Sequence, residues 1–199
     1  EIMSTDKAFV SAKMDGELVG IWYQDGKVET ITYKGTMRSN FPAVEEAGKL
    51  IKAAGYKTAL FMAEMYAVDE KTHPISYMKS STIIRNPESG KDSQLRLAVF
   101  DLIQLDGKEY LGIGIGGKME VVRKVFDKGE LIKPVHMTEG GIETAEEMWN
   151  QLDEKGWEGL VVYLGSLMYK VKPITSYDMV VVAIYKSPKY VDRMGAVLC

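Results

Sequence analysis

The sequence predicts an α+β domain in which antiparallel β-sheets are flanked by a few helices. Apolar runs of strand length recur along the chain, and an Asp25-Gly26 pair provides a hairpin turn between two of them. The regular alternation of strands and helices that is typical of a doubly wound sheet is lacking. A chain of 199 residues, 46% of them hydrophobic, can bury one sizeable core, so we expect one main domain.

The N-terminal half is expected to begin with a meander of three strands and to continue with a helix. Apolar residues at helical spacing indicate the helix, and Gly55 follows it as a stop signal. A polar stretch between two apolar strands is expected to be a long loop or a partly helical insertion. The expected elements are strands at 9–12, 19–23 and 28–33, a helix at 43–54, a strand at 58–66, the insertion at 69–93 and a strand at 95–103.

The C-terminal half is expected to contain two helices and then three strands. The glycine-rich segment 112–118 has the spacing of a phosphate-binding loop, but Met119 stands where that motif requires a hydroxyl. We therefore interpret the segment as a connection into the next helix. The expected elements are helices at 119–126 and 144–154 and strands at 159–164, 169–171 and 179–185.

Composition narrows the function classes. Cys199 is the single cysteine, which excludes a disulfide framework and a multi-cysteine zinc site, and two histidines give little support for a histidine metal cluster or a catalytic triad. The net charge of -3 provides no general attraction to nucleic acid. No apolar run in the sequence is long enough to span a bilayer, and we expect no signal peptide. We expect an intracellular protein, cytoplasmic or, in a eukaryote, nuclear, with no membrane partner.

Lys13 is a candidate nucleophile. It opens the tetrapeptide Lys13-Met14-Asp15-Gly16, which lies between two apolar runs of strand length. A lysine at the end of a buried strand and before a glycine turn is held near backbone amides, a setting in which an amine can attack an electrophile. An ordinary solvated lysine before a turn is the alternative interpretation, so the partners of Lys13 decide between the two.

Two carboxylates stand in apolar surroundings. Glu64 lies inside an otherwise apolar strand, where an unpaired carboxylate costs several kcal/mol unless it pairs, binds metal or takes part in chemistry. An edge-strand glutamate that faces water is equally compatible with the pattern. Glu158 stands at the mouth of a strand, where a carboxylate can reach a hard cation such as Mg²⁺.

Two lysines and one aromatic residue complete the candidate site. Lys170 and Lys172 alternate along a strand, so both ammonium groups are expected on one face, as in a clamp for phosphate oxygens. A solvated strand face is the commoner origin of such pairs. Phe100 can stack on a base or belong to the core.

In this order, the features resemble the motifs of the adenylation (nucleotidyltransferase) domain of ATP-dependent polynucleotide ligases, a superfamily that includes the mRNA-capping guanylyltransferases. The similarity runs in the right order from Lys13 to Lys172, and the two C-terminal motifs are the most specific. The segments are the nucleophile tetrapeptide, Ala63-Glu64-Met65, 99–108 with its aromatic Phe100, Glu158-Gly159-Leu160-Val161-Val162 and Tyr169-Lys170-Val171-Lys172.

The resemblance implies antiparallel sheets and helices around a nucleotide cleft, with an ATP-grasp-like fold. It implies that Lys13 attacks the α-phosphorus of ATP to form a lysine-AMP phosphoramidate. AMP then passes to a 5′-phosphate, and a 3′-hydroxyl displaces AMP to seal the strand. The implied cofactors are ATP and Mg²⁺ or Mn²⁺, and the implied partner is nicked DNA or RNA.

The same resemblance assigns roles to the candidate residues. The amine must be unprotonated to attack, and neighbouring cations favour that form and neutralise the α-phosphate. The residues assigned to catalysis are Lys13, Asp15, Lys170 and Lys172. Nucleotide binding is assigned to Ser11, Lys13, Lys34, Glu64, Phe100, Glu158, Lys170 and Lys172, of which Glu64 and Glu158 also bind the metal.

Two positions depart from the usual DNA ligase pattern. DNA ligases usually carry a glutamate two residues before the lysine and an arginine two residues after the glycine, where this chain has Ser11 and Leu18. The nucleophile motif, followed by Lys34, is closer to phage-type RNA ligases, and Lys34 then takes the phosphate-contacting role of an arginine. The motifs nearer the C-terminus are DNA-ligase-like.

The C-terminal segment resembles the passage into an oligonucleotide-binding (OB) domain. We therefore expect an adenylation domain at 1–188 and, at 189–199, a linker with the start of a truncated OB-fold domain. A monomeric fragment of this kind is expected to bind ATP but to adenylate itself poorly. The function classes left open are a DNA ligase, an RNA ligase, a capping-type guanylyltransferase and a non-catalytic nucleotide-binding module.

Overall fold

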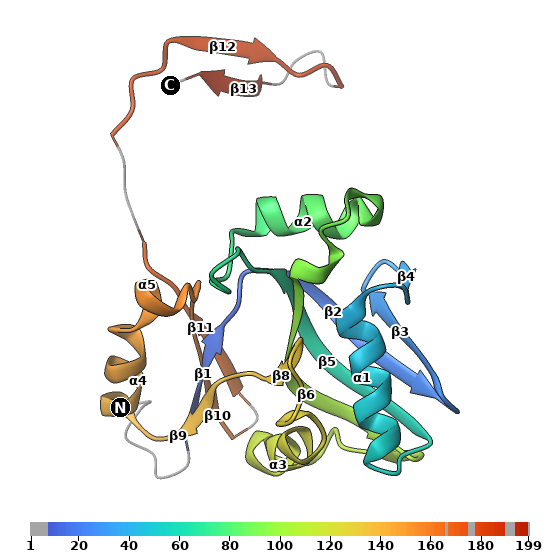
Figure 1. The fold of residues 1–199 in the computed structure, drawn as a ribbon. Coiled ribbons are helices and arrows are strands. Elements are labelled where there is room, and N and C mark those ends of the chain that lie inside the picture. Colours follow the sequence, from blue (N-terminus) through green and yellow to red (C-terminus); the bar gives the residue numbers. More distant parts are fainter. Residues whose placement is uncertain (1–7, 166, 175–177, 190–193, 199) are drawn as a thin grey trace.

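The main body consists of two antiparallel sheets and the helices that cover them, and a separate hairpin stands apart from it at the C-terminal end (Figure 1). The computed structural model describes residues 8–165, 167–174, 178–189 and 194–198. The α+β class with antiparallel sheets, predicted from the short apolar runs and the hairpin signal, is confirmed.

The larger sheet is built on neighbouring strands that pair in antiparallel fashion, with β8 added in parallel to β6. The turn between β2 and β3 has positive φ at Asp25 and Gly26, the backbone that an Asp-Gly pair adopts readily. Exposure alternates strictly along β5, so one face of that strand packs on the core. The strand order is β4 (Met37–Arg38), β3 (Lys27–Thr32), β2 (Glu17–Gln24), β5 (Thr58–Ala67), β6 (Leu95–Leu105) and β7 (Lys108–Glu109), with β8 at Ile132–Pro134.

The smaller sheet contradicts the predicted meander at 9–33. β1 pairs with β10 and β9, whereas β2 pairs with β3 and β5 in the larger sheet. Apolar periodicity predicts that a strand exists but not which distant strand it pairs with, which explains the error. The order is β11 (Leu167–Val171), β10 (Gly159–Leu164), β1 (Ala8–Lys13) and β9 (Met137–Glu139).

The helices follow the predicted pattern with two differences. The predicted helix at 144–154 is divided in two, and the predicted helix at 119–126 begins four residues earlier, inside the glycine-rich segment. The polar insertion contains α2 and two short 3₁₀ turns at Pro87–Ser89 and Asp92–Gln94. The helices are α1 (Pro42–Ala53), α2 (Tyr77–Arg85), α3 (Ile115–Phe126), α4 (Ile142–Trp149) and α5 (Leu152–Lys155).

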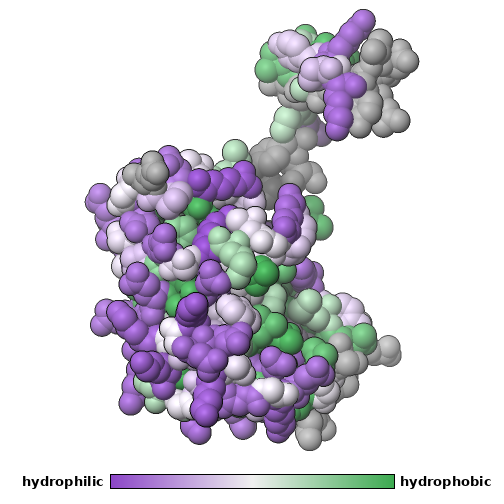
Figure 2. All heavy atoms as spheres, turned by 90° about the vertical axis from the view of Figure 1, so that its right-hand side faces the viewer, coloured by the Kyte–Doolittle hydropathy of each residue, from purple (hydrophilic) through white to green (hydrophobic). Residues whose placement is uncertain are grey.

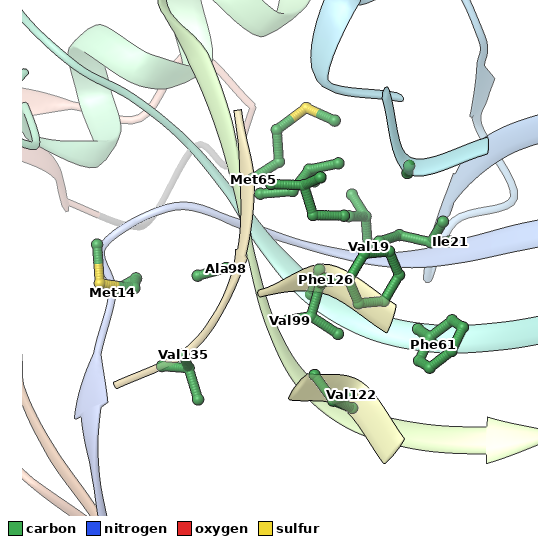
Figure 3. Packing of buried hydrophobic residues seen from close by; sticks show 14 of the residues in the cluster. Met14, Val19, Ile21, Phe61, Met65, Ala98, Val99, Val122, Phe126 and Val135 are labelled. Atoms are coloured by element: carbon green, nitrogen blue, oxygen red, sulfur yellow. The ribbon is translucent and has the colours of Figure 1, made fainter. Parts of the chain in front are cut away.

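The core lies between the larger sheet and the helices α1 and α3. Phe61 of β5 and Phe126 of α3 are fully buried and meet edge to face, with ring centroids 4.9 Å apart. Figure 3 shows Met14 and Val135 beside β1, at one side of this cluster. The residue that follows the candidate nucleophile is therefore anchored in the core.

The C-terminal hairpin consists of β12 (Ala183–Lys186) and β13 (Met194–Leu198). The strand predicted at 179–185 begins only at Ala183. Figure 2 shows the hairpin away from the body, whose visible face is mainly hydrophilic with a hydrophobic area. The two strands lie on either side of the predicted boundary at 188/189, and that boundary stays a prediction; residues 190–193 and 199 of the predicted OB segment lie outside the described residues.

Candidate active site

Lys13 stands where the chain leaves one sheet and enters the other. It is the last residue of β1, and β2 begins at Glu17 after a three-residue connection. The Lys13 carbonyl accepts a hydrogen bond from the Glu158 N–H at 2.8 Å, and the preceding Ala12 N–H donates to the His136 carbonyl at 2.9 Å. The backbone on both sides of the candidate nucleophile is therefore fixed by distant segments.

Gly16 allows this connection to lie against β5. A Cβ at position 16 would come 2.3 Å from the carbonyl oxygen of Met65, a distance that no side chain can tolerate. The Gly16 N–H donates to Glu64 Oε1 at 3.1 Å. A residue without a side chain is thus required to bring the Lys13 connection and the Glu64 carboxylate together.

Replacing Gly16 with alanine is expected to destabilise the protein by about 1–3 kcal/mol, because the backbone contact with Met65 must open and the Glu64 hydrogen bond is lost. Urea unfolding measures the change. Gly112→Ala is the matched control, since nothing lies within 4 Å of a Cβ there. Equal stability of the two variants would contradict the tight contact.

Glu158 connects two lysines. Its two carboxylate oxygens accept from Lys13 Nζ and Lys172 Nζ, respectively. Burial acts to raise the pKa of Glu158, but the hydrogen bonds from the two lysines outweigh it and hold the pKa below its ordinary value. The Glu158 carboxylate also raises the pKa of Lys172. Lys13 and Glu158 are 145 positions apart in the chain, and together with Lys172 they form one charged cluster.

Glu64 belongs to the same cluster but has the opposite character. Burial raises the pKa of its carboxyl group to about 7, although Lys13 and the Gly16 N–H act to lower it. The negative charges of Glu158 and Asp15 add a smaller upward contribution. Glu64 is therefore a half-buried carboxyl group on a central strand, between β2 and β6, and the interpretation as a water-facing edge residue is wrong.

The raised pKa of Glu64 predicts that stability falls as the pH rises. The folded protein retains a proton on Glu64 up to about pH 7, whereas the unfolded chain releases it near 4.5. Protonated Glu64 therefore contributes on the order of 3 kcal/mol to the free energy of unfolding below pH 4.5. This contribution is lost as the pH rises past about 7.

Urea unfolding at pH 5 and pH 8 checks this contribution. Glu64→Gln is expected to make the difference between the two pH values smaller, because the amide does not titrate. Glu120→Gln, an exposed position on α3, is the control and should leave the difference as in the wild type. An unchanged pH dependence in Glu64→Gln would contradict the assignment.

Asp15 has a structural contact of its own. Its Oδ2 accepts a hydrogen bond from the backbone N–H of Tyr77 at 2.7 Å, at the first residue of α2. A carboxylate at a helix N-terminus is stabilised by the unpaired N–H groups there. Asp15 thereby fixes α2 beside the candidate nucleophile.

Two neighbouring cavities meet at Lys13. The first cavity has a volume of about 390 Å³ and a mainly apolar lining that includes Ser11, Phe100 and Lys170. The second cavity has a volume of about 680 Å³ and includes Asp15, Lys34 and Glu158 in its lining. The residues common to both are Lys13, Gly16, Leu18 and Glu64, which therefore mark the junction between the cavities.

The structure thus brings the predicted residues together, although in two groups. Ser11, Phe100 and Lys170 line the first cavity only, and Lys34 lines the second only. Phe100 is also packed against the core, as one of its two interpretations expects, and its stacking on a base stays a prediction. Lys172, just beyond β11, reaches Glu158.

Some lining residues were not found from the sequence. Arg38 and Arg85 line the second cavity, and Arg38 Nη1 pairs with Glu17 Oε2 at 3.0 Å. Tyr163 lines the first cavity. Arg38 lies on a two-residue strand and Arg85 at the end of a helix, so the periodicity of apolar residues gives no signal for either of them. Tyr163 lies on the strand that follows Glu158 and could have been found from its alternation with Val161.

A metal ion would depend on few protein ligands here. Among the described residues no group of three or more histidine, cysteine, aspartate or glutamate side chains is arranged to hold a metal ion. Glu64 and Glu158 are nevertheless close enough for the charge of one to raise the pKa of the other. Mg²⁺ is commonly bound through one or two carboxylates together with substrate phosphates, so these two residues fit such an ion.

The fold is similar to that of solved DNA ligases. A minimal Lig E DNA ligase superposes with a TM-score of 0.66 at 18% identity, over 97% of this chain and 73% of that one. Mycobacterial DNA ligase D, solved with ATP and MES, superposes with a TM-score of 0.62 at 17% identity, over 84% of this chain and 52% of that one. These likenesses confirm the predicted fold.

The chain belongs to the ATP dependent DNA ligase domain family, whose model matches residues 1–176. A probable DNA ligase of Pseudarthrobacter chlorophenolicus is 22% identical in an alignment of 194 residues that covers 90% of this chain and 36% of that protein. The chain spans about a third of the length of the curated relatives that it matches. In the described parts of the chain, every helix is too short or too polar to cross a membrane.

Proposed function

We propose that this chain is the adenylation domain of an ATP-dependent DNA ligase. The observation that carries the proposal is the position of Lys13 at the junction of an apolar cavity and a charged one, beside Glu64 and Glu158. The apolar cavity suits a base and the charged one suits phosphates, and this arrangement supports an attack of the amine on the α-phosphate of ATP.

The first reaction is the transfer of AMP to Lys13. Its unprotonated Nζ attacks the α-phosphorus, a P–N bond forms, the P–O bond to pyrophosphate breaks, and the phosphoramidate nitrogen loses a proton to water. Because Nζ is held by Glu158, that contact must be exchanged before attack. Lys170 and Lys172 then neutralise charge on the α-phosphate, and Asp15 holds the connection in place through α2.

The remaining predicted residues bind the nucleotide. Phe100 contacts the base in the first cavity, and Lys34 contacts phosphate in the second. Glu64 and Glu158 would hold Mg²⁺ or Mn²⁺, which, when bound, supplies further neutralisation of phosphate charge. The pKa of about 7 at Glu64 means that this residue binds a cation better as the pH rises above neutral.

Joining of nicked DNA is proposed for the whole protein, inside the cell. AMP passes from Lys13 to a 5′-phosphate, and a 3′-hydroxyl displaces it to seal the nick. Membership of the ATP dependent DNA ligase domain family supports this substrate. The second candidate is nicked RNA, favoured by Leu18 and Lys34, which together give the nucleophile region its RNA-ligase-like character.

Labelling with α-³²P nucleotides tests the proposal in a form of the protein extended to the length of its curated relatives. Label on Lys13 from ATP is expected. Label from GTP would instead indicate a capping-type guanylyltransferase. The absence of label from both nucleotides would indicate a non-catalytic nucleotide-binding module. Sealing of nicked duplex DNA in preference to nicked RNA is the expected second result, and the reverse preference would overturn the DNA assignment.

The chain of 199 residues is expected to be a monomer that binds ATP while adenylating itself poorly. Calorimetric titration with ATP, sedimentation, and labelling of the same preparation check these three expectations. Efficient formation of lysine-AMP by residues 1–199 alone would contradict the third of them.

A further inference from the structure

Lys118 is a buried lysine that the proposed reaction does not use. It ends the glycine-rich segment 112–118, and the structure places it near the start of α3 with only 8% of its surface exposed. A Cβ at Gly116 would come 2.6 Å from Phe9 Cζ, so the glycine lets this part of α3 lie against β1. The segment therefore carries its lysine into the interior of the domain.

Asp101 of β6 is the partner of this lysine. Lys118 Nζ lies 2.8 Å from Asp101 Oδ1, and the same oxygen accepts a hydrogen bond from the Leu102 N–H at 2.8 Å. The side chains of Lys118 and Asp101 are 10% and 25% exposed, so the pair is largely shielded from solvent. Such a pair adds little net stability but can fix one arrangement of the chain, because separating the charges leaves each of them unpaired in the interior.

The pair lies beside an irregularity in strand pairing that involves Phe100. Asp101 is opposite Met62, whereas Val99 is opposite Ala63. Phe100, between them, is therefore an extra residue in the β5–β6 register, and it lines the first cavity. The extra residue of a bulge is left out of the ladder, and bulges beside binding sites serve to redirect a side chain. An anchor on the next residue can thus determine where the ring of Phe100 lies.

We propose that the Lys118–Asp101 ion pair is a positioning element that holds Phe100 toward the first cavity and thereby strengthens binding of the nucleotide. The proposal rests on the proposed function, because it concerns the contact of Phe100 with the base. Lys118 and Asp101 are not among the described residues that line the two cavities, so their effect must pass through a neighbour such as Phe100. They are positioning residues and do not touch the nucleotide.

Calorimetry on the 199-residue chain tests the proposal by comparing ATP with inorganic tripolyphosphate, which has phosphates but no base. Removing both charges together, in Lys118→Met/Asp101→Asn, avoids leaving one charge buried and unpaired. This double variant is expected to bind ATP about tenfold more weakly, while its tripolyphosphate affinity changes by less than about twofold. Lys118→Arg, which keeps the ion pair, should bind ATP within about threefold of the wild type.

A double-mutant cycle with Phe100→Leu separates positioning from a general structural role. If the pair acts through the ring, neutralising it in the Phe100→Leu background should change ATP affinity by less than about twofold. Lys124→Met is the matched control, since Lys124 is exposed on the same helix and should leave ATP affinity as in the wild type.

Three results would overturn the inference while the ligase assignment stands: unchanged ATP affinity in the double variant, an equal loss of tripolyphosphate affinity, or a full further loss in the Phe100→Leu background. Thermal unfolding of each variant verifies that the fold is retained. Loss of the cooperative transition in the double variant would assign the pair to the stability of the domain and also overturn the inference. If ATP does not bind the wild type, the proposed function and the inference both fail.

Discussion

Replacing Lys13 with arginine is expected to abolish formation of the lysine-AMP intermediate, with a loss on the order of 10³-fold or more. The guanidinium keeps the positive charge and the pairing with Glu158, but it has no free electron pair to attack phosphorus at physiological pH. Labelling by α-³²P ATP in the extended form of the protein measures the loss.

The same variant separates chemistry from binding. Because charge and approximate size are retained, ATP affinity of the 199-residue chain should change by less than about tenfold in Lys13→Arg. Lys49→Arg, an exposed position on α1, is the control and should label normally. Label retained in Lys13→Arg would show that another residue is the nucleophile.

Replacing Glu158 with glutamine is expected to lower the rate of adenylation by about 10²-fold. The amide has nearly the shape of the carboxylate but lacks the charge that holds Lys13 and Lys172 together, and it is a weaker ligand for a hard cation. Single-turnover labelling at saturating ATP isolates the chemical step from nucleotide binding.

A nearby glutamate provides the control for this charge removal. Glu154 is exposed on α5 and, among the residues that the structure describes, pairs with its neighbour Lys155, so Glu154→Gln should label at the wild-type rate. A second measurement varies the Mg²⁺ concentration, and Glu158→Gln should require more of the ion for half-maximal labelling. A wild-type rate and metal requirement in Glu158→Gln would remove this residue from the site.

The sequence was most informative where order along the chain carried the signal. Lys13, Glu64, Phe100, Glu158 and the two lysines near the C-terminus were recognised because their motifs occur in a fixed order, and the structure places all of them at two adjoining cavities or at Glu158. Strand and helix positions could also be predicted from the sequence, since apolar periodicity reflects which face of each element is buried.

The pairing of strands was not predictable in the same way. The three N-terminal strands were expected to form one meander, yet β1 belongs to a sheet completed by β10, about 150 residues away. Periodicity is a local property, whereas the choice of partner depends on the packing of the whole domain. Arg38 and Arg85 were missed because their position at the site arises only from this packing.

The sequence by itself thus indicates the residue types of the proposed site, which are an amine, two carboxylates and two further lysines in a recognisable order. Only the tertiary structure decided that Lys13 stands between two sheets, that one carboxylate is held ionised by two lysines, and that burial raises the pKa of the other to about 7. The reason is physical. Residue types determine which reactions are possible, but desolvation and Coulomb interactions depend on distances between segments that are far apart in the chain.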